Sequence, residues 1–325
     1  MAVRVGVVGC GYWGRNLVRV FHELGVLCAV CDVDVALATE FSSEYSVPSL
    51  EWVEILGDSS IDAVAIATPA EVHSTQALQS LQAGKHVFVE KPLALHSYEA
   101  EEIIALANQG ERVLMVGHLL QYHPAFLALR DLTEAGKLGR LQYIYSNRLN
   151  FGKVRREENV FWSFAPHDIS MILSLTGEMP NSISAKGASY LHKVIADVTN
   201  TYLTFPSGVN AHIFVSWLHP FKEQKLIVVG SDGMAVFDDM KDWREKLQLY
   251  PHRIGWREGL PEPEKGVAEA VSIQQGEPLK IEAQHFVDCV SDGSTPRTNG
   301  TEALRVLKIL EETESILAEQ RLGGG

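Results

Sequence analysis

The chain has few cysteines, no long apolar run and no excess of positive charge. Its four cysteines among 325 residues, Cys10, Cys28, Cys31 and Cys289, lack the spacing of a metal site. No apolar run reaches the ~20 residues that span a bilayer. The formal charge of −13 disfavours nucleic acid and anionic membrane surfaces as main partners. These absences favour a cytoplasmic protein with reduced cysteines, while Cys28-x-x-Cys31 leaves a redox pair as an alternative.

A glycine-rich motif lies near the start of the chain. The residues Gly9-Cys10-Gly11-Tyr12-Trp13-Gly14 follow an apolar run at 3–8 and precede a helical pattern. Gly9 allows a tight turn, Gly11 lets the backbone approach a pyrophosphate, and Gly14 lets helix and strand pack closely. The helix N-terminus offers amides to the phosphates. Asp32 ends the next apolar run, where an acid binds ribose hydroxyls and favours NAD over NADP. The motif predicts an NAD site that includes these residues.

The organisation of the chain changes near residue 120. Before it, apolar runs at 3–8, 27–31, 61–67, 86–89 and 113–116 alternate with helical patterns, one of them capped by Ser97. This alternation predicts a doubly wound parallel sheet, an α/β Rossmann domain over residues 1–120. After it, strands at 141–146, 200–205, 210–217, 225–229 and 234–238, helices at 167–175 and 301–318, and a loop at 255–276 are expected. They predict an α+β domain over 121–325 with a large, mostly antiparallel, open-faced sheet.

Two short segments carry candidate catalytic groups. Glu90-Lys91-Pro92 follows the strand at 86–89, at the carboxyl edge of the sheet, where a lysine can lie near a nicotinamide and a substrate oxygen. A plain surface turn is the alternative. His167 follows Pro166 and precedes an apolar helical pattern, which places it at a helix N-terminus, where the dipole keeps the imidazole neutral and able to accept a proton. A structural cap on a buried helix is the alternative for His167. Asp168 suits the first turn of the same helix, where it serves as a dipole partner. The other histidines show no ligand spacing, so no metal is predicted.

These motifs together resemble the glucose–fructose oxidoreductase/inositol dehydrogenase/rhizopine catabolism family of sugar dehydrogenases. The resemblance is carried by Gly9-x-Gly11-x-x-Gly14, Asp32, Thr68-Pro69, His73, Ala83-Gly84-Lys85-His86-Val87, Glu90-Lys91-Pro92 and His167-Asp168. It implies that Lys91 lies between nicotinamide and substrate and His167 near the oxidised hydroxyl. It also implies that Thr68, Pro69, His73 and Glu90 line the nicotinamide half of the cofactor. Many members carry an acid where this chain has Ser163, so Lys91 and His167 are left to share proton handling.

The segment before His167 suggests a substrate. Arg148, Lys153, Arg155 and Arg156 form a cationic cluster in an acidic chain, which suits a diphosphate; the alternative is a solvated loop paired with Glu157 and Glu158. Residues 150–170 most resemble the branch that oxidises C3 of UDP-N-acetylhexosamines. The resemblance implies UDP-N-acetylglucosamine as substrate and a 3-keto product for an aminotransferase in lipid A or surface polysaccharide synthesis. Together with the arginine cluster, it leads us to expect substrate contacts from Lys91, Arg148, Asn150, Arg155, Arg156, Ser163 and His167.

Three other functions fit the same residues. One is oxidation of a free polyol or monosaccharide such as inositol, which needs no diphosphate pocket. Another is an NAD-dependent glycosidase that oxidises C3 transiently, and the third is a cofactor-bound sensor or assembly protein without turnover. The resemblance implies a homodimer or homotetramer, and the exposed face of the second-domain sheet is the expected subunit interface.

Overall fold

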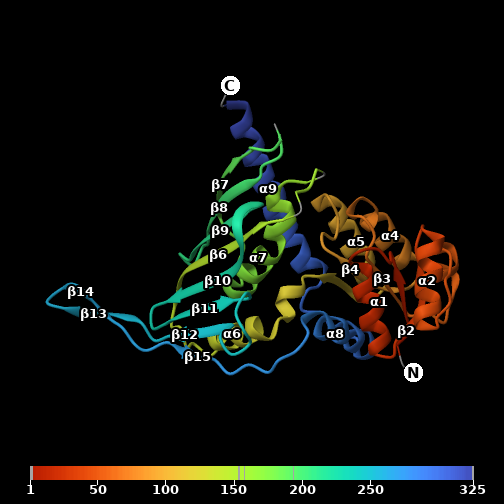
Figure 1. The fold of residues 1–325 in the computed structure, drawn as a ribbon, viewed down its shortest axis with the longest axis horizontal. Helices are drawn as coiled ribbons and strands as arrows, with labels where there is room; N and C mark the ends of the chain where they lie inside the picture. Colours follow the sequence, from red (N-terminus) through yellow and green to blue (C-terminus); the bar gives the residue numbers. More distant parts are fainter. Residues whose placement is uncertain (1–2, 153, 157, 193, 324–325) are drawn as a thin grey trace. The chain divides into compact units, whose positions relative to one another are not determined.

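The computed structural model describes residues 3–152, 154–156, 158–192 and 194–323. The chain divides into two compact units (Figure 1). The first contains Met1–Tyr122 and Glu277–Leu307, and the second contains His123–Gly276 and Lys308–Gly325. The first change of unit lies between Tyr122 and His123. The segment Glu277–Leu307, which the sequence analysis placed in the second domain, returns to the first unit.

The first unit is a Rossmann fold, as predicted. Its five parallel strands have the order β2-β1-β3-β4-β5. The strands are β1 (Val5–Val8), β2 (Leu27–Cys31), β3 (Ala63–Ile66), β4 (His86–Glu90) and β5 (Leu114–Gly117). The helices between them are α1 (Gly14–Glu23), α2 (Val35–Tyr45), α3 (Trp52–Gly57), α4 (Ala70–Gln82) and α5 (Ser97–Gln109), followed by a 3₁₀ turn, η1 (Leu119–Tyr122). Helix α3 was not predicted, and His96 rather than Ser97 is the N-cap of α5.

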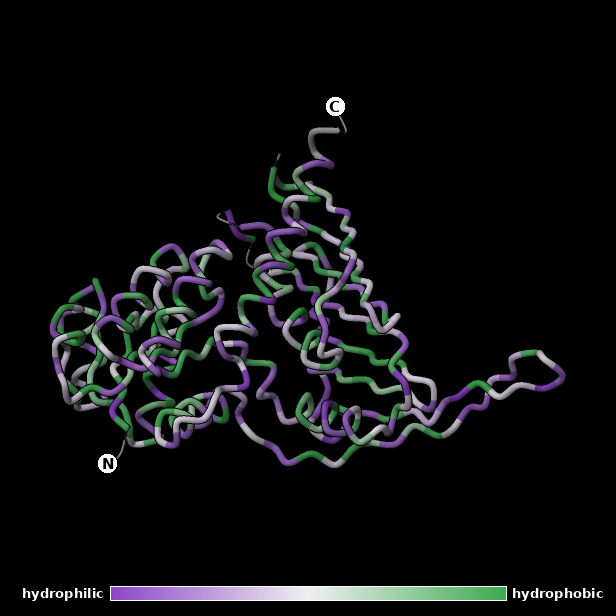
Figure 2. Tube along the Cα trace, turned by 180° about the vertical axis from the view of Figure 1, so that it is seen from behind, coloured by the Kyte–Doolittle hydropathy of each residue, from purple (hydrophilic) through white to green (hydrophobic). Residues whose placement is uncertain are grey.

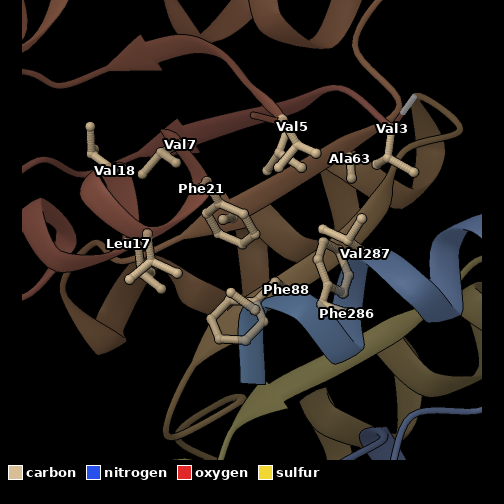
Figure 3. Packing of buried hydrophobic residues seen from close by; sticks show 14 of the residues in the cluster. Val3, Val5, Val7, Leu17, Val18, Phe21, Ala63, Phe88, Phe286 and Val287 are labelled. Carbon is tan, nitrogen blue, oxygen red and sulfur yellow. The ribbon is translucent and has the colours of Figure 1, made fainter. Parts of the chain in front are cut away.

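Helix α8 (Pro278–Asp292), also not predicted, completes the core of this unit. Its Phe286 packs edge-to-face against Phe21 of α1 and Phe88 of β4, with ring centroids 6.4 and 5.7 Å apart (Figure 3). Burying an aromatic ring on each of three elements stabilises their packing. The returning segment is therefore part of the folding unit that carries the glycine motif.

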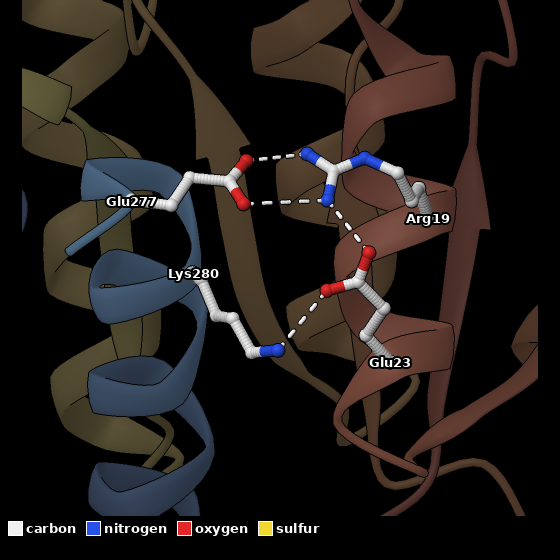
Figure 4. A network of polar contacts seen from close by, with 4 residues as sticks. All are labelled: Arg19, Glu23, Glu277 and Lys280. Atoms are coloured by element: carbon white, nitrogen blue, oxygen red, sulfur yellow. Dashed lines mark hydrogen bonds and ion pairs between the residues drawn. The ribbon is translucent and has the colours of Figure 1, made fainter.

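A chain of ion pairs on the surface joins α1 to the start of α8 (Figure 4). Arg19 of α1 binds both Glu23 and Glu277, and Lys280 of α8 lies 3.0 Å from Glu23. These side chains are 36–46% exposed, so each pair contributes little compared with the aromatic core.

The second unit is built on an eight-stranded sheet, with the order β15-β12-β11-β10-β6-β9-β8-β7. Only the pair β6–β9 is parallel among the strand pairs described for this sheet, which confirms the mostly antiparallel prediction. The strands are β6 (Leu141–Phe151), β7 (Ser182–Ala188), β8 (Val198–Thr204), β9 (Asn210–Ser216), β10 (Leu218–Gly230), β11 (Met234–Asp238), β12 (Leu247–Tyr250) and β15 (Glu269–Ala270). Helices α6 (Pro124–Glu134) and α7 (Val160–Thr176) pack against it.

Two predictions for this unit were wrong, one about where a helix begins and one about a loop. Helix α7 begins at Val160 rather than at His167 and contains Pro166 in its interior. The expected loop at 255–276 contains most of a hairpin, β13 (Arg253–Arg257) and β14 (Leu260–Glu264), which forms its own two-stranded sheet. The last helix, α9 (Gly300–Gly323), begins in the first unit and ends in the second.

Candidate active site

The three glycines of the motif have separable roles in the structure. Gly9 adopts φ +88°, and a Cβ added there would lie 2.8 Å from the backbone of Ala67. A Cβ on Gly14 would lie 1.8 Å from the carbonyl oxygen of Gly9. A Cβ on Gly11, in contrast, would meet nothing within 4 Å. Gly9 and Gly14 are therefore required by the fold, whereas the open space at Gly11 fits a pyrophosphate against the backbone, at the start of α1.

Asp32 is fixed next to this loop. Its Oδ2 accepts a hydrogen bond of 2.6 Å from the amide of Cys10, and its Oδ1 accepts one of 2.9 Å from the amide of Asp34. Both bonds hold the carboxylate at the end of β2, beside the glycine loop. This is the position from which an acid binds the ribose hydroxyls of NAD, so the chain's residues fit this cofactor.

Glu90 connects the glycine loop to the turn that carries Lys91. It is the last residue of β4, and its carboxylate accepts a hydrogen bond from the indole Nε1 of Trp13. Burial raises the pKa of Glu90 to about 7, against the opposing effects of Trp13 and the Lys91 charge. Lys91 follows directly at the carboxyl edge of the parallel sheet, where ligands of such folds bind. The structure thus places Trp13, Glu90 and Lys91 along one connected path.

The residues after β3 differ in their tasks. Thr68 donates a hydrogen bond of 2.6 Å from its hydroxyl to Gln76, and Pro69 is the N-cap of α4. His73 is 1% exposed, and its ring nitrogens lie 2.8 Å from the carbonyl oxygen of Thr68 and 2.7 Å from that of Pro92. The structure thus gives His73 two backbone neighbours, whereas its implied contact with the cofactor stays a prediction. Its ring ties the end of β3 to the Glu90-Lys91-Pro92 turn.

Sequence reasoning missed two groups near Glu90. His118 follows β5 directly, as Lys91 follows β4, and its Nδ1 lies 2.6 Å from Glu302, which also accepts from Gln121. The position of His118 directly after an apolar, strand-like run was the signal in the sequence that could have marked it as a site residue. Glu282 of α8 is fully buried, and both carboxyl oxygens lack a hydrogen-bond partner among the described residues. No sequence signal indicated it, because its burial depends on how α8 packs.

In the second unit, His167 lies in the interior of α7. Asn159 is the N-cap of this helix, and its Oδ1 accepts hydrogen bonds from the amides of Phe161 and Trp162 at 2.9 and 3.1 Å. The positive end of the helix dipole is therefore at Val160, two turns before His167. The dipole argument for a neutral His167 was wrong, and so was the interpretation of Asp168 as a first-turn dipole partner.

Asp168 instead forms a buried ion pair. Its carboxylate accepts hydrogen bonds from Arg148 Nε and Nη2 at 2.7 and 3.0 Å and from the Ser146 hydroxyl at 2.7 Å. Asp168 is 1% exposed and Arg148 8%. This bidentate pair attaches α7 to β6 and fixes the helix next to His167. The guanidinium of Arg148, predicted as a substrate contact, is thus engaged by Asp168.

The remaining predicted substrate residues lie on the same stretch of chain. Arg155 and Arg156 are exposed, and Arg155 Nε lies 3.1 Å from Glu158. Asn150 is partly buried near the end of β6, and Ser163 is buried one helical turn before His167. Lys153 and Glu157 lie outside the described residues. The predicted cluster of four cations thus separates into a buried structural Arg148 and an exposed pair, Arg155 and Arg156.

The cysteines are poor candidates for redox chemistry. Burial raises the pKa of Cys28 and of Cys31 to about 11 and that of Cys10 to about 12. A thiol that stays protonated at neutral pH is a weak nucleophile. Among the described residues, no group of three or more His, Cys, Asp or Glu side chains could hold a metal ion.

Comparison with family models decides the family. Residues 3–118 match the model described as an oxidoreductase family with an NAD-binding Rossmann fold, and residues 126–236 match that of the GFO/IDH/MocA C-terminal domain. The chain belongs to the GFO/IDH/MocA oxidoreductase family. Its cofactor is NAD, which agrees with the open space at Gly11 and the fixed carboxylate of Asp32.

Individual members of the family are similar over nearly the whole chain. The UDP-N-acetylglucosamine 3-dehydrogenase of Acidithiobacillus ferrooxidans is 29% identical over 94% of this chain and 94% of its own. A solved structure of that enzyme aligns with a TM-score of 0.88 and 26% identity, over 99% of both chains. The inositol 2-dehydrogenase of Rhizobium meliloti is 24% identical over 99% of this chain and 98% of its own. Within the part of the chain that the structure describes, no helix has the length and apolar composition of a membrane span.

Proposed function

We propose that this chain oxidises the C3 hydroxyl of a UDP-N-acetylhexosamine, with UDP-N-acetylglucosamine as the first candidate. The observation that carries the proposal is the placement of Lys91, which directly follows β4 and is linked through Glu90 and Trp13 to the glycine loop. The similarity to the Acidithiobacillus ferrooxidans enzyme over 94% of the chain supports the choice of substrate.

Each candidate group has a defined chemical task. NAD, when bound, supplies the hydride acceptor. Lys91 stabilises the negative charge that develops on the substrate oxygen as the hydroxyl proton leaves. His167 accepts that proton as a general base, held by a helix that the Arg148–Asp168 pair attaches to β6. Ser163 and Asn150 contact the sugar.

The exposed arginines are assigned to the diphosphate. Arg155 and Arg156 present guanidinium groups that can bind phosphate oxygens in a bidentate manner. The product, a 3-keto sugar, then passes to an aminotransferase in lipid A or surface polysaccharide synthesis. Four buried cysteines that form no disulfide agree with the cytoplasmic location that this proposal includes.

The decisive experiment incubates the purified protein with NAD and a panel of sugars and follows NADH. The panel contains UDP-N-acetylglucosamine, UDP-N-acetylgalactosamine, UDP-glucose, free N-acetylglucosamine and myo-inositol. Glutamate and an aminotransferase that accepts 3-keto sugars are added to draw an unfavourable equilibrium forward. NADH formation with a UDP-N-acetylhexosamine is expected, and its absence with every nucleotide sugar would reject the proposal.

Variants test the assigned groups. Lys91→Ala and His167→Ala are each expected to lower kcat by roughly 10²–10⁴-fold, because each removes one charge-stabilising or proton-accepting group. NAD affinity, measured by calorimetry, should change little in His167→Ala. Near-normal turnover in both variants would contradict the assignment.

Oxidation of a free polyol is the second candidate. The inositol dehydrogenases of Rhizobium meliloti and Bacillus subtilis, each 24% identical over 99% and 94% of this chain, favour it. The two candidates differ at the arginine pair. Replacing Arg155 and Arg156 by Glu should raise KM for a UDP-sugar and leave KM for inositol unchanged.

A further inference from the structure

A cavity of about 560 Å³ lies in the first unit, at the amino edge of the parallel sheet. Two of its lining residues, His86 and Leu114, are the first residues of β4 and β5, whereas Glu90 ends β4 at the opposite edge. The residues that line it all belong to the first unit. Ligand pockets usually measure roughly 300–1,000 Å³, so this cavity can hold a small molecule apart from the NAD site.

The buried part of the cavity lining is apolar. The chain passes here from the hydrophilic residues 108–112 to the apolar run 113–116, and such changes recur along the tube of the first unit in Figure 2. The buried lining residues, which we call the apolar floor, are Ala107, Val113, Leu114, Pro296 and Gly300. A ligand that covers this floor removes apolar surface from water, so the floor favours an apolar group.

His86 and Arg112 add hydrogen-bond donors to the lining. The Nδ1 of His86 accepts a hydrogen bond of 2.9 Å from the amide of Val113, so the neutral imidazole carries its proton on Nε2. Burial, and secondarily the charge of Arg112, lowers the pKa of His86 against the smaller effect of Asp62, which keeps the ring neutral at pH 7. Arg112 is exposed, and the ion pairs among the described residues do not involve it. A guanidinium beside an N–H donor suits a carboxylate.

Glu111 brings a negative charge to the same lining. It follows Gly110, the C-cap of α5, and adopts φ +52°. This left-handed conformation favours glycine and is unfavourable for a residue with a Cβ, so a glutamate here indicates a role for its carboxylate. The charges of Glu111 and Arg112 cancel, and a ligand that carries one positive and one negative group is complementary to both.

We propose that this cavity binds a free α-amino acid with a large apolar side chain. The carboxylate of the ligand contacts Arg112 and the Nε2 proton of His86, and its ammonium group contacts Glu111. Its side chain packs on the apolar floor. An α-amino acid carries these three groups on a single carbon atom. The site does not depend on the substrate assigned above, and its ligand does not compete with NAD.

The first test measures the binding of L-phenylalanine and L-leucine to the full-length protein by calorimetry. Saturable binding with a Kd of about 1 mM or below is expected, and saturating NAD should leave it unchanged. N-acetyl-L-phenylalanine lacks the ammonium group and L-phenylalaninamide lacks the carboxylate, so each should bind at least about tenfold more weakly. Absence of saturable binding of both amino acids, undiminished binding of either analogue, or competition with NAD would overturn the proposal.

The second test changes the two charged side chains. Arg112→Gln and Glu111→Gly should each raise the Kd for L-phenylalanine at least about tenfold. Glu258→Gly is the matched control, because Glu258 has the same φ of +52° but lies between β13 and β14, outside the lining. Circular dichroism and NAD binding establish that each variant is folded. An unchanged Kd in either cavity variant, or an equal loss in Glu258→Gly, would contradict the assignment of the site.

A third test uses the unaltered protein. A leucine analogue with a photoreactive diazirine in its side chain is bound and irradiated, and the modified peptides are identified by mass spectrometry. Modification within residues 104–114 or 293–301, and its suppression by excess L-leucine, are expected. Modification confined to other parts of the chain would place the ligand elsewhere and overturn the proposal.

Discussion

At the residue scale, Glu282 is an ionisable carboxyl group in a fully buried, apolar position, where its charged form is unfavourable. Burial, and secondarily the charge of Glu90, raises the pKa of its carboxyl well above the ordinary 4.5. The folded protein therefore keeps this proton at pH values where the unfolded chain has released it. Such a group stabilises the fold fully below pH 4.5, and this contribution is lost as the pH rises toward the folded-state pKa.

Glu282→Gln removes this titration. Relative to the wild type, the free energy of unfolding of the variant should increase between about pH 5 and about pH 8, by at most ~1.4 kcal/mol per pH unit. Urea denaturation at both pH values measures the difference. The exposed Glu40→Gln serves as the control and should show no such trend. A pH-independent difference for Glu282→Gln would contradict the prediction.

The Arg148–Asp168 ion pair leads to a prediction about the stability of two variants. Asp168→Ala leaves a guanidinium that is 8% exposed without its carboxylate, and breaking a buried pair in this way costs about 3–5 kcal/mol. Ser146→Ala removes a hydroxyl that donates to the same carboxylate at 2.7 Å and lies 3.5 Å from the carbonyl oxygen of Lys225, and it should cost about 0.5–1.5 kcal/mol. Chemical denaturation of the two variants measures how much unfolding free energy each substitution removes. Equal losses would show that the ion pair does not hold α7.

Some residue roles were readable from the sequence and others were not. Asp32 and Lys91 were placed correctly with respect to their strands, because the end of a buried apolar run fixes which edge of a parallel sheet a residue occupies. The ion pair of Arg148 was not readable, because its partner Asp168 lies twenty residues away on another element. A local cluster of cations in sequence does not reveal which of them is buried.

At the element scale, the glycine loop allows a test that separates folding from cofactor binding. Gly11→Ala introduces a methyl group that meets nothing within 4 Å, so the fold should be unchanged. The same methyl occupies the space where the pyrophosphate approaches, and NAD affinity should fall at least about tenfold, or ~1.4 kcal/mol. Calorimetry with NAD and a thermal melt measure the two effects.

The neighbouring glycines provide the controls. Gly14→Ala places a Cβ 1.8 Å from the backbone of Gly9 and should lower both stability and binding. Gly57 at the end of α3 also has open space, and Gly57→Ala should change neither. If Gly11→Ala bound NAD normally, the assignment of this loop to the pyrophosphate would be wrong.

The elements whose bounds or existence the sequence did not predict each lack the local sequence signal of their type. Helix α7 is buried on most sides, so it shows no amphipathic stripe, and Pro166 resembled a first helical residue. The β13–β14 turn uses Glu258-Gly259 rather than Asn-Gly, and its prolines resembled those of a loop. By contrast, β1, β2 and β3 were predictable because strands of a parallel sheet are continuous apolar runs.

At the scale of the whole molecule, the chain leaves the first unit at Tyr122 and returns to it at Glu277. The returning segment contributes Leu279, Ala283, Phe286, Val287 and Cys289 to the core of the Rossmann fold. It also lies along β5, where the amide of Val116 donates a hydrogen bond of 2.8 Å to the carbonyl oxygen of Thr298. Residues 1–122 are therefore an incomplete folding unit.

A fragment experiment tests this. Losing one buried Phe costs about 3–5 kcal/mol, a large part of the 5–15 kcal/mol that stabilises a typical domain. Residues 1–122 alone should not melt cooperatively or bind NAD, because α8 takes five core side chains with it. Residues 1–122 joined by a flexible linker to 277–307 should do both. The linked fragment with Phe286→Asp is the matched control and should behave like the short one. Cooperative melting and NAD binding by residues 1–122 alone would show that the returning segment is dispensable for the fold.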